Sequence, residues 1–349
     1  MSNIINFDIT TNPDYFKACR LIGCGGYGEV IEIVHLPTGR HFAGKILRKL
    51  SIDEKSLENI KNEISMMQSI RNDNIINYYG IINFPKENPH YIVVMDYCDR
   101  GSLRDILNNT QKTLNEDQIS IVMHDILLAV SYLHDEHKIY HSDIKAANIL
   151  MSSDTSIKLS DFGLSKKIDN SEENLTISGS PYWMAPEVIL AEKHSFPADI
   201  WSIGITAVEL HEGRPPFYEY PSSRAMNEII SLGFPGFRDE STISPQFADF
   251  VKKCCQIRPN QRPKASQLLD HPFIKQSEKL DRKQIFKDLL QNETNFNDLI
   301  DSEDFDELQK FIHFENIPKI SSKTNFNEKK EKMISSEGFL NNQNPVLRV

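Results

Sequence analysis

The feature of this sequence that most constrains its fold and chemistry is a pair of short polar motifs. The first is HSDIKAAN at residues 141–148, and the second is DFG, which begins at Asp161. Asp143 can orient an attacking hydroxyl and accept its proton, and Lys145 can neutralise charge on a transferring phosphate. Asn148 and Asp161 offer the hard oxygen ligands that Mg²⁺ prefers. A polar loop with solvated carboxylates is the alternative, but the two motifs in this order favour phosphoryl transfer.

Length, composition and charge limit the class of protein. The 349 residues suffice for one large domain or two, with a substantial buried core. Hydrophobic residues make up 39% and charged residues 25%, which is typical of a soluble globular protein. The net charge of −10, without a basic stripe, argues against nucleic-acid binding and favours basic partners and substrates.

The cysteines and the opening residues bear on location. Five cysteines, an odd number without a CxxC pair, predict neither a disulfide framework nor a zinc site. A reducing compartment is the simpler interpretation. The opening residues MSNIINFDIT lack the basic and apolar regions of a signal peptide, and no apolar run approaches the ~18–20 residues that span a bilayer. We therefore expect a cytoplasmic protein that does not bind membranes.

The hydrophobic pattern changes along the chain. Residues 16–48 alternate apolar and polar side chains and predict three short strands joined by turns, and residues 91–95 predict a buried strand. Residues 119–133 repeat apolar side chains at helical spacing, behind a capping box of Asn115 and Gln118.

A second helix is expected further along the chain. Residues 200–210 are apolar nearly all round, which predicts a core helix. Gly213 and the prolines Pro215 and Pro216 are expected to end it.

A glycine-rich segment, GCGGYGEV at residues 23–30, matches the pattern G-x-G-x-x-G-x-V. Dinucleotide-binding folds use the same glycines, but they need a helix directly afterwards. Here the chain continues as EVIEIVHLPTG, which predicts a strand and a turn. We therefore expect a hairpin whose backbone N–H groups approach phosphate oxygens. Tyr27 could shield the phosphates from water, and Val30 would pack on the adenine.

A capping box at Ser51 and Glu54 predicts the start of a helical region, and within the next helix Ile60, Ile64, Met67 and Ile70 form an apolar stripe. Glu63 falls inside this stripe, where a carboxylate is costly unless it has a cationic partner or reaches the edge. Lys45, on the third predicted strand, can supply that cation. Its ammonium also suits the α- and β-phosphates of a nucleotide.

The sequence resembles the eukaryotic protein kinases over about three quarters of its length. The shared motifs, all in the family's order, are residues 23–30, Lys45, Glu63, residues 141–148, Asp161-Phe162-Gly163, Ala185-Pro186-Glu187, Asp199 and Arg262. The strings DIKAANIL, GSPYWMAPEVI and DIWSIGITAVEL are similar to those of the sterile-twenty-like group. The resemblance implies an α+β, two-lobed protein-kinase fold, with a small, mainly β N-lobe carrying one key helix and a larger, mainly α C-lobe.

The resemblance also implies the domain organisation. The kinase domain is expected at residues 16–274, with the N-lobe at about 16–95 and the C-lobe at about 99–274. Residues 1–15 would be an N-terminal extension. The rest of the chain, 275–349, is rich in Asn, Lys, Glu and Asp, and we expect a polar tail, partly helical or disordered. This tail could bind a regulatory partner.

The same resemblance assigns the site residues, with ATP and Mg²⁺ as cofactors. The catalytic residues would be Asp143, Lys145, Asn148, Lys45 and Glu63, and the metal ligands Asn148 and Asp161. The nucleotide would be bound by Ile22, Gly23, Cys24, Gly25, Gly26, Tyr27, Gly28, Val30, Ala43, Lys45, the gatekeeper Met95, and the hinge residues Asp96 and Cys98. Glu187 and Arg262 would form a buried ion pair, and Asp199 would hold the catalytic-loop backbone.

The expected activity is ATP-dependent phosphorylation of Ser and Thr hydroxyls on protein substrates in intracellular signalling. Lys145 and Ser180 stand where Ser/Thr kinases place an ammonium and a hydroxyl near the acceptor. A catalytically silent pseudokinase scaffold is the alternative, which loss of Lys45, Asp143 or Asp161 would have favoured. A small-molecule kinase is disfavoured by the peptide platform at 185–187.

One residue departs from the family's pattern. Ser142 replaces the Arg that in many relatives pairs with a phosphorylated activation loop, and a hydroxyl cannot substitute for that charge. Thr176 matches the usual phosphorylation site, and Lys166 could be a remaining partner. We therefore expect that phosphorylation of this loop controls the enzyme less than it controls relatives that carry Arg.

Overall fold

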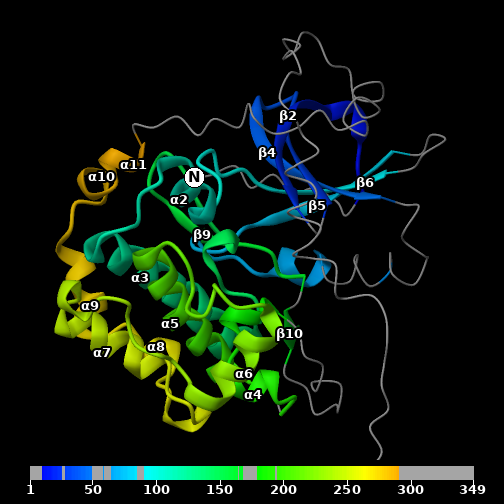
Figure 1. The fold of residues 1–349 in the computed structure, drawn as a ribbon. Helices are drawn as coiled ribbons and strands as arrows, with labels where there is room; N and C mark the ends of the chain where they lie inside the picture. The colour runs from blue at the N-terminus through cyan, green and yellow to red at the C-terminus, as the bar shows by residue number, and fades with distance from the viewer. Residues whose placement is uncertain are drawn as a thin grey trace, which may run out of the picture. The chain divides into compact units, whose positions relative to one another are not determined.

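The computed structural model describes residues 10–25, 28–48, 58, 64–84, 90–163, 165–167, 179–192 and 195–290. Its N-terminal part is a β-sheet and its C-terminal part is mainly helical, so the predicted two-lobed α+β fold is confirmed (Figure 1). Within the described ranges, no helix is both long enough and apolar enough to cross a bilayer.

The N-terminal sheet has the strand order β1-β5-β6-β4-β3-β2. Its strands are β1 (Thr10–Thr11), β2 (Phe16–Gly25), β3 (Gly28–His35), β4 (Arg40–Arg48), β5 (Tyr78–Phe84) and β6 (His90–Asp96). Strands β2 to β6 pair antiparallel, and β1 runs parallel to β5. The glycine-rich segment therefore continues into strand β3, as predicted, rather than into a helix.

Apolar side chains from the sheet and from the following helix are buried. Ile31, Ile33 and Phe42 on β3 and β4 are at most 1% exposed. Residues 64–69 are helical, and Ile64 and Met67 of the predicted stripe are buried. The predicted capping box at 51–54 and Glu63 lie outside the described residues.

The C-terminal part contains five helices of eight residues or more within the described ranges. They are α2 (Leu103–Thr110), α3 (Glu116–Tyr132), α5 (Phe196–Glu212), α6 (Ser222–Leu232) and α7 (Pro245–Cys254). Shorter helices are α4 (Pro186–Ile189), α8 (Ala265–Leu268), α9 (Pro272–Lys275), α10 (Arg282–Ile285) and α11 (Lys287–Leu290).

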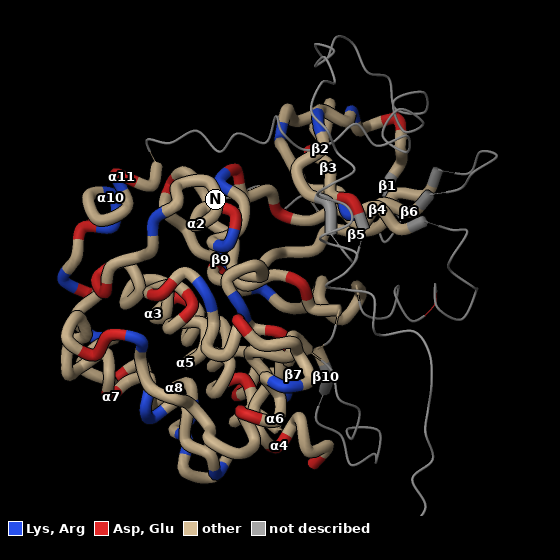
Figure 2. The backbone as a smooth tube through the Cα atoms, viewed as in Figure 1, with Lys and Arg blue, Asp and Glu red and all other residues tan. Residues whose placement is uncertain are grey.

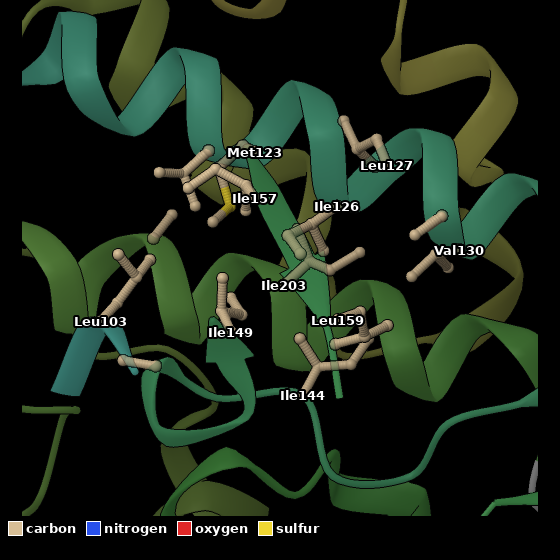
Figure 3. Packing of buried hydrophobic residues seen from close by; sticks show 14 of the residues in the cluster. Leu103, Met123, Ile126, Leu127, Val130, Ile144, Ile149, Ile157, Leu159 and Ile203 are labelled. Atoms are coloured by element: carbon tan, nitrogen blue, oxygen red, sulfur yellow. The ribbon is translucent and has the colours of Figure 1, made fainter. Parts of the chain in front are cut away.

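Helices α3 and α5 carry the core of this part. Asn115 and Gln118 form the predicted capping box at the start of α3. Helix α5 is buried along most of its length, and it ends at Gly213, whose φ of +80° suits glycine. Figure 3 shows Ile126 of α3 and Ile203 of α5 in one apolar cluster.

Two small antiparallel ladders bring the opening sequence motifs together. Strands β8 (Ile149–Met151) and β9 (Ile157–Leu159) form one pair, and β7 (Ile139–Tyr140) and β10 (Lys166–Lys167) form the other. HSDIKAAN therefore lies between β7 and β8, and DFG lies between β9 and β10. Because each ladder pairs a strand next to one motif with a strand next to the other, residues far apart in sequence meet at one place.

Ordered packing continues beyond the expected start of the polar tail. Arg282 forms an ion pair with Asp125 of α3 at 2.6 Å, and Gln118 of α3 donates a hydrogen bond to the carbonyl of Ile285. Phe286 is completely buried. The first segment of the predicted tail thus contacts α3 through Arg282 and Ile285 and packs against the apolar core as far as Leu290. Residues 291–349 lie outside the described ranges.

Candidate active site

Asp143 and Lys145 of the catalytic loop form a hydrogen-bonded cluster with Ser180, which lies further along the chain. The Nζ of Lys145 lies 2.8 Å from Oδ2 of Asp143 and donates a hydrogen bond to Oγ of Ser180 at 2.5 Å. The backbone N–H of Ser180 donates to Oδ1 of Asp143 at 3.0 Å. The structure therefore brings together a carboxylate, an ammonium and a hydroxyl, as the reaction on an acceptor hydroxyl requires.

Asp143 is held in its ionised form. Burial alone would raise its pKa, but Lys145, the hydrogen bonds from Lys145 and Ser180, and nearby His141 together lower the pKa below its ordinary value. An aspartate of low pKa is a weak general base. It is suited to orienting an acceptor hydroxyl and taking up the proton as the new bond forms.

Of the two predicted metal ligands, Asn148 contacts Asp143 directly. The amide nitrogen of Asn148 donates to the main-chain carbonyl of Asp143 at 2.8 Å and to its Oδ2 at 3.0 Å, so the amide oxygen is the atom available to a cation. Among the described residues, no group of three or more His, Cys, Asp and Glu side chains could hold a metal alone. This donor set fits Mg²⁺, which is commonly held by one or two carboxylates together with phosphate oxygens and water.

Lys45 and Asp161 meet across the site. The Nζ of Lys45 on β4 lies 3.3 Å from Oδ1 of Asp161, and both side chains remain about one quarter exposed. Asp161 has a φ of +62°, a left-handed conformation that Asp tolerates better than most residues. Glu63, the predicted partner of Lys45, lies outside the described residues.

Phe162 and His141 fix the backbone between the two motifs. Phe162 is 1% exposed and its ring packs against that of His141, with centroids 4.8 Å apart. The Nε2 of His141 lies 3.0 Å from the carbonyl oxygen of Ser160, and its Nδ1 accepts from the backbone N–H of Asp143. The histidine thus ties the start of the catalytic loop to the residues just before Asp161.

Helix α5 holds the start of the catalytic loop through Asp199. This carboxylate is 1% exposed and accepts hydrogen bonds from the backbone N–H groups of His141 and Ser142, at 2.8 and 2.9 Å. His134 donates to Oδ2 of the same carboxylate, which also accepts from His141, at 2.8 Å. Burial raises the pKa of Asp199, but these donors outweigh it and lower the pKa. This is the structural role that the resemblance implied.

Two further residues of α5 reach the loop, and sequence reasoning missed both. The hydroxyl of Thr206 lies 3.2 Å from the carbonyl oxygen of Ile144 and 2.7 Å from that of Ser202, one turn back in α5, so the two carbonyls share its one proton. Glu209 accepts from the backbone N–H of Ala146 at 2.9 Å. With Asp199, these polar residues follow each other at spacings of seven and three, so they lie on one face of the helix. That spacing within an otherwise apolar helix is the signal that could have identified them.

The predicted nucleotide-binding residues of the sheet lie on adjacent strands. Ala43 pairs with Met95 across β4 and β6, and Val30 pairs with Lys45 across β3 and β4. Gly23 pairs with Val30 at the base of the glycine-rich hairpin. Gly25 pairs with Gly28, whereas Gly26, Tyr27 and the side chain of Cys24 lie outside the described residues.

Ile22, on β2, is partly buried against the core, and Cys98, in the hinge, is 6% exposed. Burial raises the pKa of the Cys98 thiol to about 11, so it remains a neutral thiol at physiological pH.

The side chain of the hinge residue Asp96 is bound from several elements at once. Its Oδ1 accepts from the hydroxyl of Tyr79 at 2.6 Å, and its Oδ2 accepts from the amide of Asn77 at 2.8 Å. Lys158 on β9 and Arg40 on β4 lie 3.2 and 3.6 Å away. Burial raises the pKa of Asp96, but Lys158 and these donors outweigh it and lower the pKa.

No sequence motif contains Asp96 together with its partners, because these residues are scattered between positions 40 and 158.

The segment expected to bind peptide is fixed by buried polar contacts. Arg262 forms two hydrogen bonds to Glu187, at 2.6 and 2.8 Å, and both side chains are buried. Trp183 donates from Nε1 to Glu209 at 2.8 Å, and Ser202 of α5 donates to the carbonyl of Trp183. The buried ion pair implied by the resemblance is therefore present.

Ser142 is held by its backbone rather than by its side chain. Its φ is +71°, and its N–H is one of the two backbone donors to Asp199. Within the described part of the chain, its hydroxyl is buried and has no hydrogen-bond partner. Thr176 and the side chain of Lys166 lie outside the described residues.

Comparison with known proteins agrees with this arrangement. The family described as protein kinase domain matches residues 16–274. Three similar proteins of Dictyostelium discoideum are the serine/threonine-protein kinases pakF and pakG and serine/threonine-protein kinase 4 homolog A. They are 37%, 39% and 41% identical over 78%, 74% and 74% of this chain. The aligned parts cover 23%, 21% and 55% of those proteins, so the chain spans between one fifth and about half of their lengths.

Proposed function

The chain belongs to the protein kinase domain family, and from this premise we propose that it transfers the γ-phosphate of ATP to Ser and Thr hydroxyls of protein substrates. The observation that carries this proposal is the cluster of Asp143, Lys145 and Ser180, with the ion pair between Lys45 and Asp161 beside it. The names of the similar proteins support the Ser/Thr class.

In this proposal each residue has one task. Asp143 orients the acceptor hydroxyl and takes up its proton, and Lys145 compensates negative charge on the transferring phosphate. Lys45, with Glu63, positions the ATP phosphates. Asn148 and Asp161 would hold Mg²⁺, which would neutralise phosphate charge when bound. We also propose the glycine-rich hairpin and the hinge as the nucleotide-binding surface.

The test is transfer of labelled phosphate from MgATP to a generic basic protein, followed by identification of the phosphorylated amino acids. Wild-type protein should modify Ser and Thr, and Asp161→Asn should lower the rate by about 1000-fold because a metal ligand is lost. Asp154→Asn is the matched control, since this exposed aspartate lies in the turn before β9. Nucleotide-dependent stabilisation without any transfer would instead identify a pseudokinase scaffold.

A regulatory role for the C-terminal tail and a cytoplasmic location belong to the same proposal. Among the described cysteines, Cys19, Cys98, Cys254 and Cys255 are free thiols, which supports a reducing compartment. The tail is best tested by ending the chain after Leu290. Ending it after residue 275 would remove Arg282 from buried Asp125, so it would confuse loss of stability with loss of regulation.

A further inference from the structure

A groove of about 460 Å³ lies beside the segment that follows Ser180. Its walls come from α2 and the residues just after it, from the end of α5 and the segment that follows, and from Trp183 of the short 3-10 turn Pro181–Trp183. The lining residues that matter here are Arg104, Lys112, Trp183, Arg214, Tyr218 and Arg238.

The groove is richer in cations than in carboxylates. Four of its lining residues are Arg or Lys, and Glu212 is the only acidic one. This local excess is opposite to the net charge of −10 of the whole chain. Figure 2 shows basic and acidic residues interspersed along the described chain, so a local excess of cations is a distinct feature of this groove.

Two of the four cations are already neutralised by carboxylates outside or at the edge of the groove. Arg104 pairs with Glu209 and also donates to the carbonyl of Gly213. Arg238 lies 3.3 Å from Glu212 and 2.7 Å from Glu219. These pairs fix the two guanidinium groups in place.

The other two cations are available to a ligand. The guanidinium of Arg214 lies 4.9 Å from the ring centroid of Tyr218, and both side chains are exposed. Lys112 is also exposed. In the part of the chain that the structure describes, neither Arg214 nor Lys112 has a carboxylate within ion-pair distance.

The groove is joined to the catalytic loop by Glu209. Its Oε2 accepts from the indole of Trp183, which lines the groove, and from the backbone N–H of Ala146, which follows Lys145. Trp183 also lies three residues after Ser180, which contacts Asp143 and Lys145. A peptide whose acceptor hydroxyl reaches Asp143 would therefore pass next to the groove.

We propose that this groove binds an acidic side chain of the protein substrate, either a carboxylate or a phosphate, and so selects acidic sequences. The inference rests on the proposed kinase activity and specifies its substrate class. The available guanidinium of Arg214 can bind two oxygens of a carboxylate or phosphate, and the ammonium of Lys112 in the same groove adds a point charge. It reverses the preference for basic substrates that the net charge predicts.

The experiment measures kcat/KM for peptides with one Ser acceptor, in which Ala, Glu, phosphoserine or Lys is placed at successive positions on both sides. With the full chain, Glu or phosphoserine should raise kcat/KM by about fivefold over Ala at one or more positions, and Lys should lower it. The double variant Lys112→Glu, Arg214→Glu should lose this preference and favour Lys at the same positions.

The matched control is Lys279→Glu with Lys283→Glu, two exposed lysines of the C-terminal segment that change the net charge by the same amount. This control should keep the wild-type preference. The inference is overturned if wild type shows no acidic preference, if the groove variant keeps it, or if the control loses it.

A second measurement separates this inference from the proposed function. Fluorescence anisotropy of the labelled Glu, phosphoserine and Ala peptides reports binding without turnover. If no peptide is phosphorylated, the kinase proposal fails. The groove proposal is still supported if wild type binds acidic peptides more tightly than the Ala peptide and the groove variant does not. Equal binding of all the peptides overturns it. Comparing the Glu and phosphoserine peptides tells which anion the groove prefers.

Discussion

The catalytic loop (141–148) and the hinge (96–98) are both held by buried carboxylates. The carboxylates that hold the loop belong to another element, whereas the one that holds the hinge belongs to the hinge itself. The loop is held by Asp199 and Glu209, which belong to helix α5 and lie more than fifty residues further along the chain. The hinge is held by its own residue, Asp96, whose partners come from strands of both parts of the molecule.

The surroundings of the two sets of carboxylates also differ. The donors to Asp199 are backbone N–H groups and an imidazole in the interior. Two cations near Asp96 reach solvent, and the side chain of Arg40 is 44% exposed. Interactions at the catalytic loop are therefore little screened by salt, whereas those at the hinge depend partly on ionic conditions. Five changes test this difference, from the largest expected effect to the smallest.

Asp199→Asn should have the largest effect. Three donors converge on the two carboxylate oxygens, and an amide would turn one acceptor into a fourth donor. Because the site is buried, we expect a loss of about 3 kcal/mol in the free energy of unfolding. Displacement of the loop should lower kcat by about 100-fold. Urea denaturation and steady-state kinetics measure both quantities.

Asp249→Asn is the control for Asp199→Asn, because Asp249 also contacts a Lys and a His but its side chain is half exposed. Equal losses in both variants would contradict the prediction.

Asp96→Asn should act on nucleotide binding more than on turnover. The loss of a charge that binds Tyr79 and Lys158 loosens the hinge, so KM for ATP should rise about tenfold while kcat changes by less than about twofold. The lowered pKa means that the charge of Asp96 stabilises the fold above its ordinary pKa of 3.8, and that this contribution is lost as pH falls through the folded value. Asp99→Asn is the control, because Asp99 lies in the same region and accepts one backbone hydrogen bond. A fall in kcat at unchanged KM would contradict a positioning role.

Thr206→Val should cost about 1 kcal/mol of unfolding free energy, because the carbonyls of Ile144 and Ser202 lose the buried hydroxyl that they share. We expect kcat to fall about threefold. Thr110→Val is the control: Thr110 donates to the carbonyl of Ile106 in its own helix and accepts from the backbone N–H of Lys112, and neither partner belongs to the catalytic loop. Thermal denaturation and kinetics of the two variants should separate helix stability from contact with the loop. If Thr110→Val lowers kcat equally, the loop contact has no special role.

Glu209→Gln should be tolerated better than Asp199→Asn, although Glu209 also accepts from three donors. The remaining amide oxygen can still accept from Ala146 and Trp183, and the donor that loses its acceptor, Arg104, is partly exposed to solvent. Burial raises the pKa of Glu209 despite the ion pair with Arg104, so the folded protein favours its neutral form more than the unfolded chain does. The variant should differ from wild type by less than about 1 kcal/mol at neutral pH. The stability that wild type gains from this group is present below the ordinary pKa of 4.5 and is lost as pH rises through the raised value. Urea denaturation at several pH values should therefore show the variant gaining on wild type as pH rises, and the opposite trend would contradict the prediction.

Thr176→Ala should have the smallest effect, with activity within about threefold of wild type. Ser142 carries no charge to pair with a phosphate, and its backbone is already fixed by Asp199. Ser142→Arg tests the same idea from the other side, because it should make activity depend on Thr176. Phosphate-transfer assays of the two variants and their combination measure this. A collapse of Thr176→Ala to background would show that phosphorylation of the loop is required.

Local patterns predicted a large share of the fold. The three strands in residues 16–48, the capping box of α3 and the end of α5 at Gly213 were each predictable, because neighbouring residues determine them. The contact of Lys45 with Asp161 was not predicted, because the sequence and the resemblance pointed to Glu63 as the partner of Lys45. The contacts of Asp96 could not be predicted, since Tyr79, Asn77 and Lys158 belong to different elements.

By itself, the sequence determined the chemistry that this protein carries: a carboxylate, an ammonium and two oxygen ligands within HSDIKAAN and DFG. It also determined where strands and helices form, because hydrophobic periodicity and caps act over a few residues. Only the tertiary structure decided which carboxylates hold the loop and the hinge, and in which direction their pKa values shift. The pKa of a buried group depends on its burial and on donors brought from elsewhere in the chain, so Asp199 and Glu209, on one helix, shift in opposite directions.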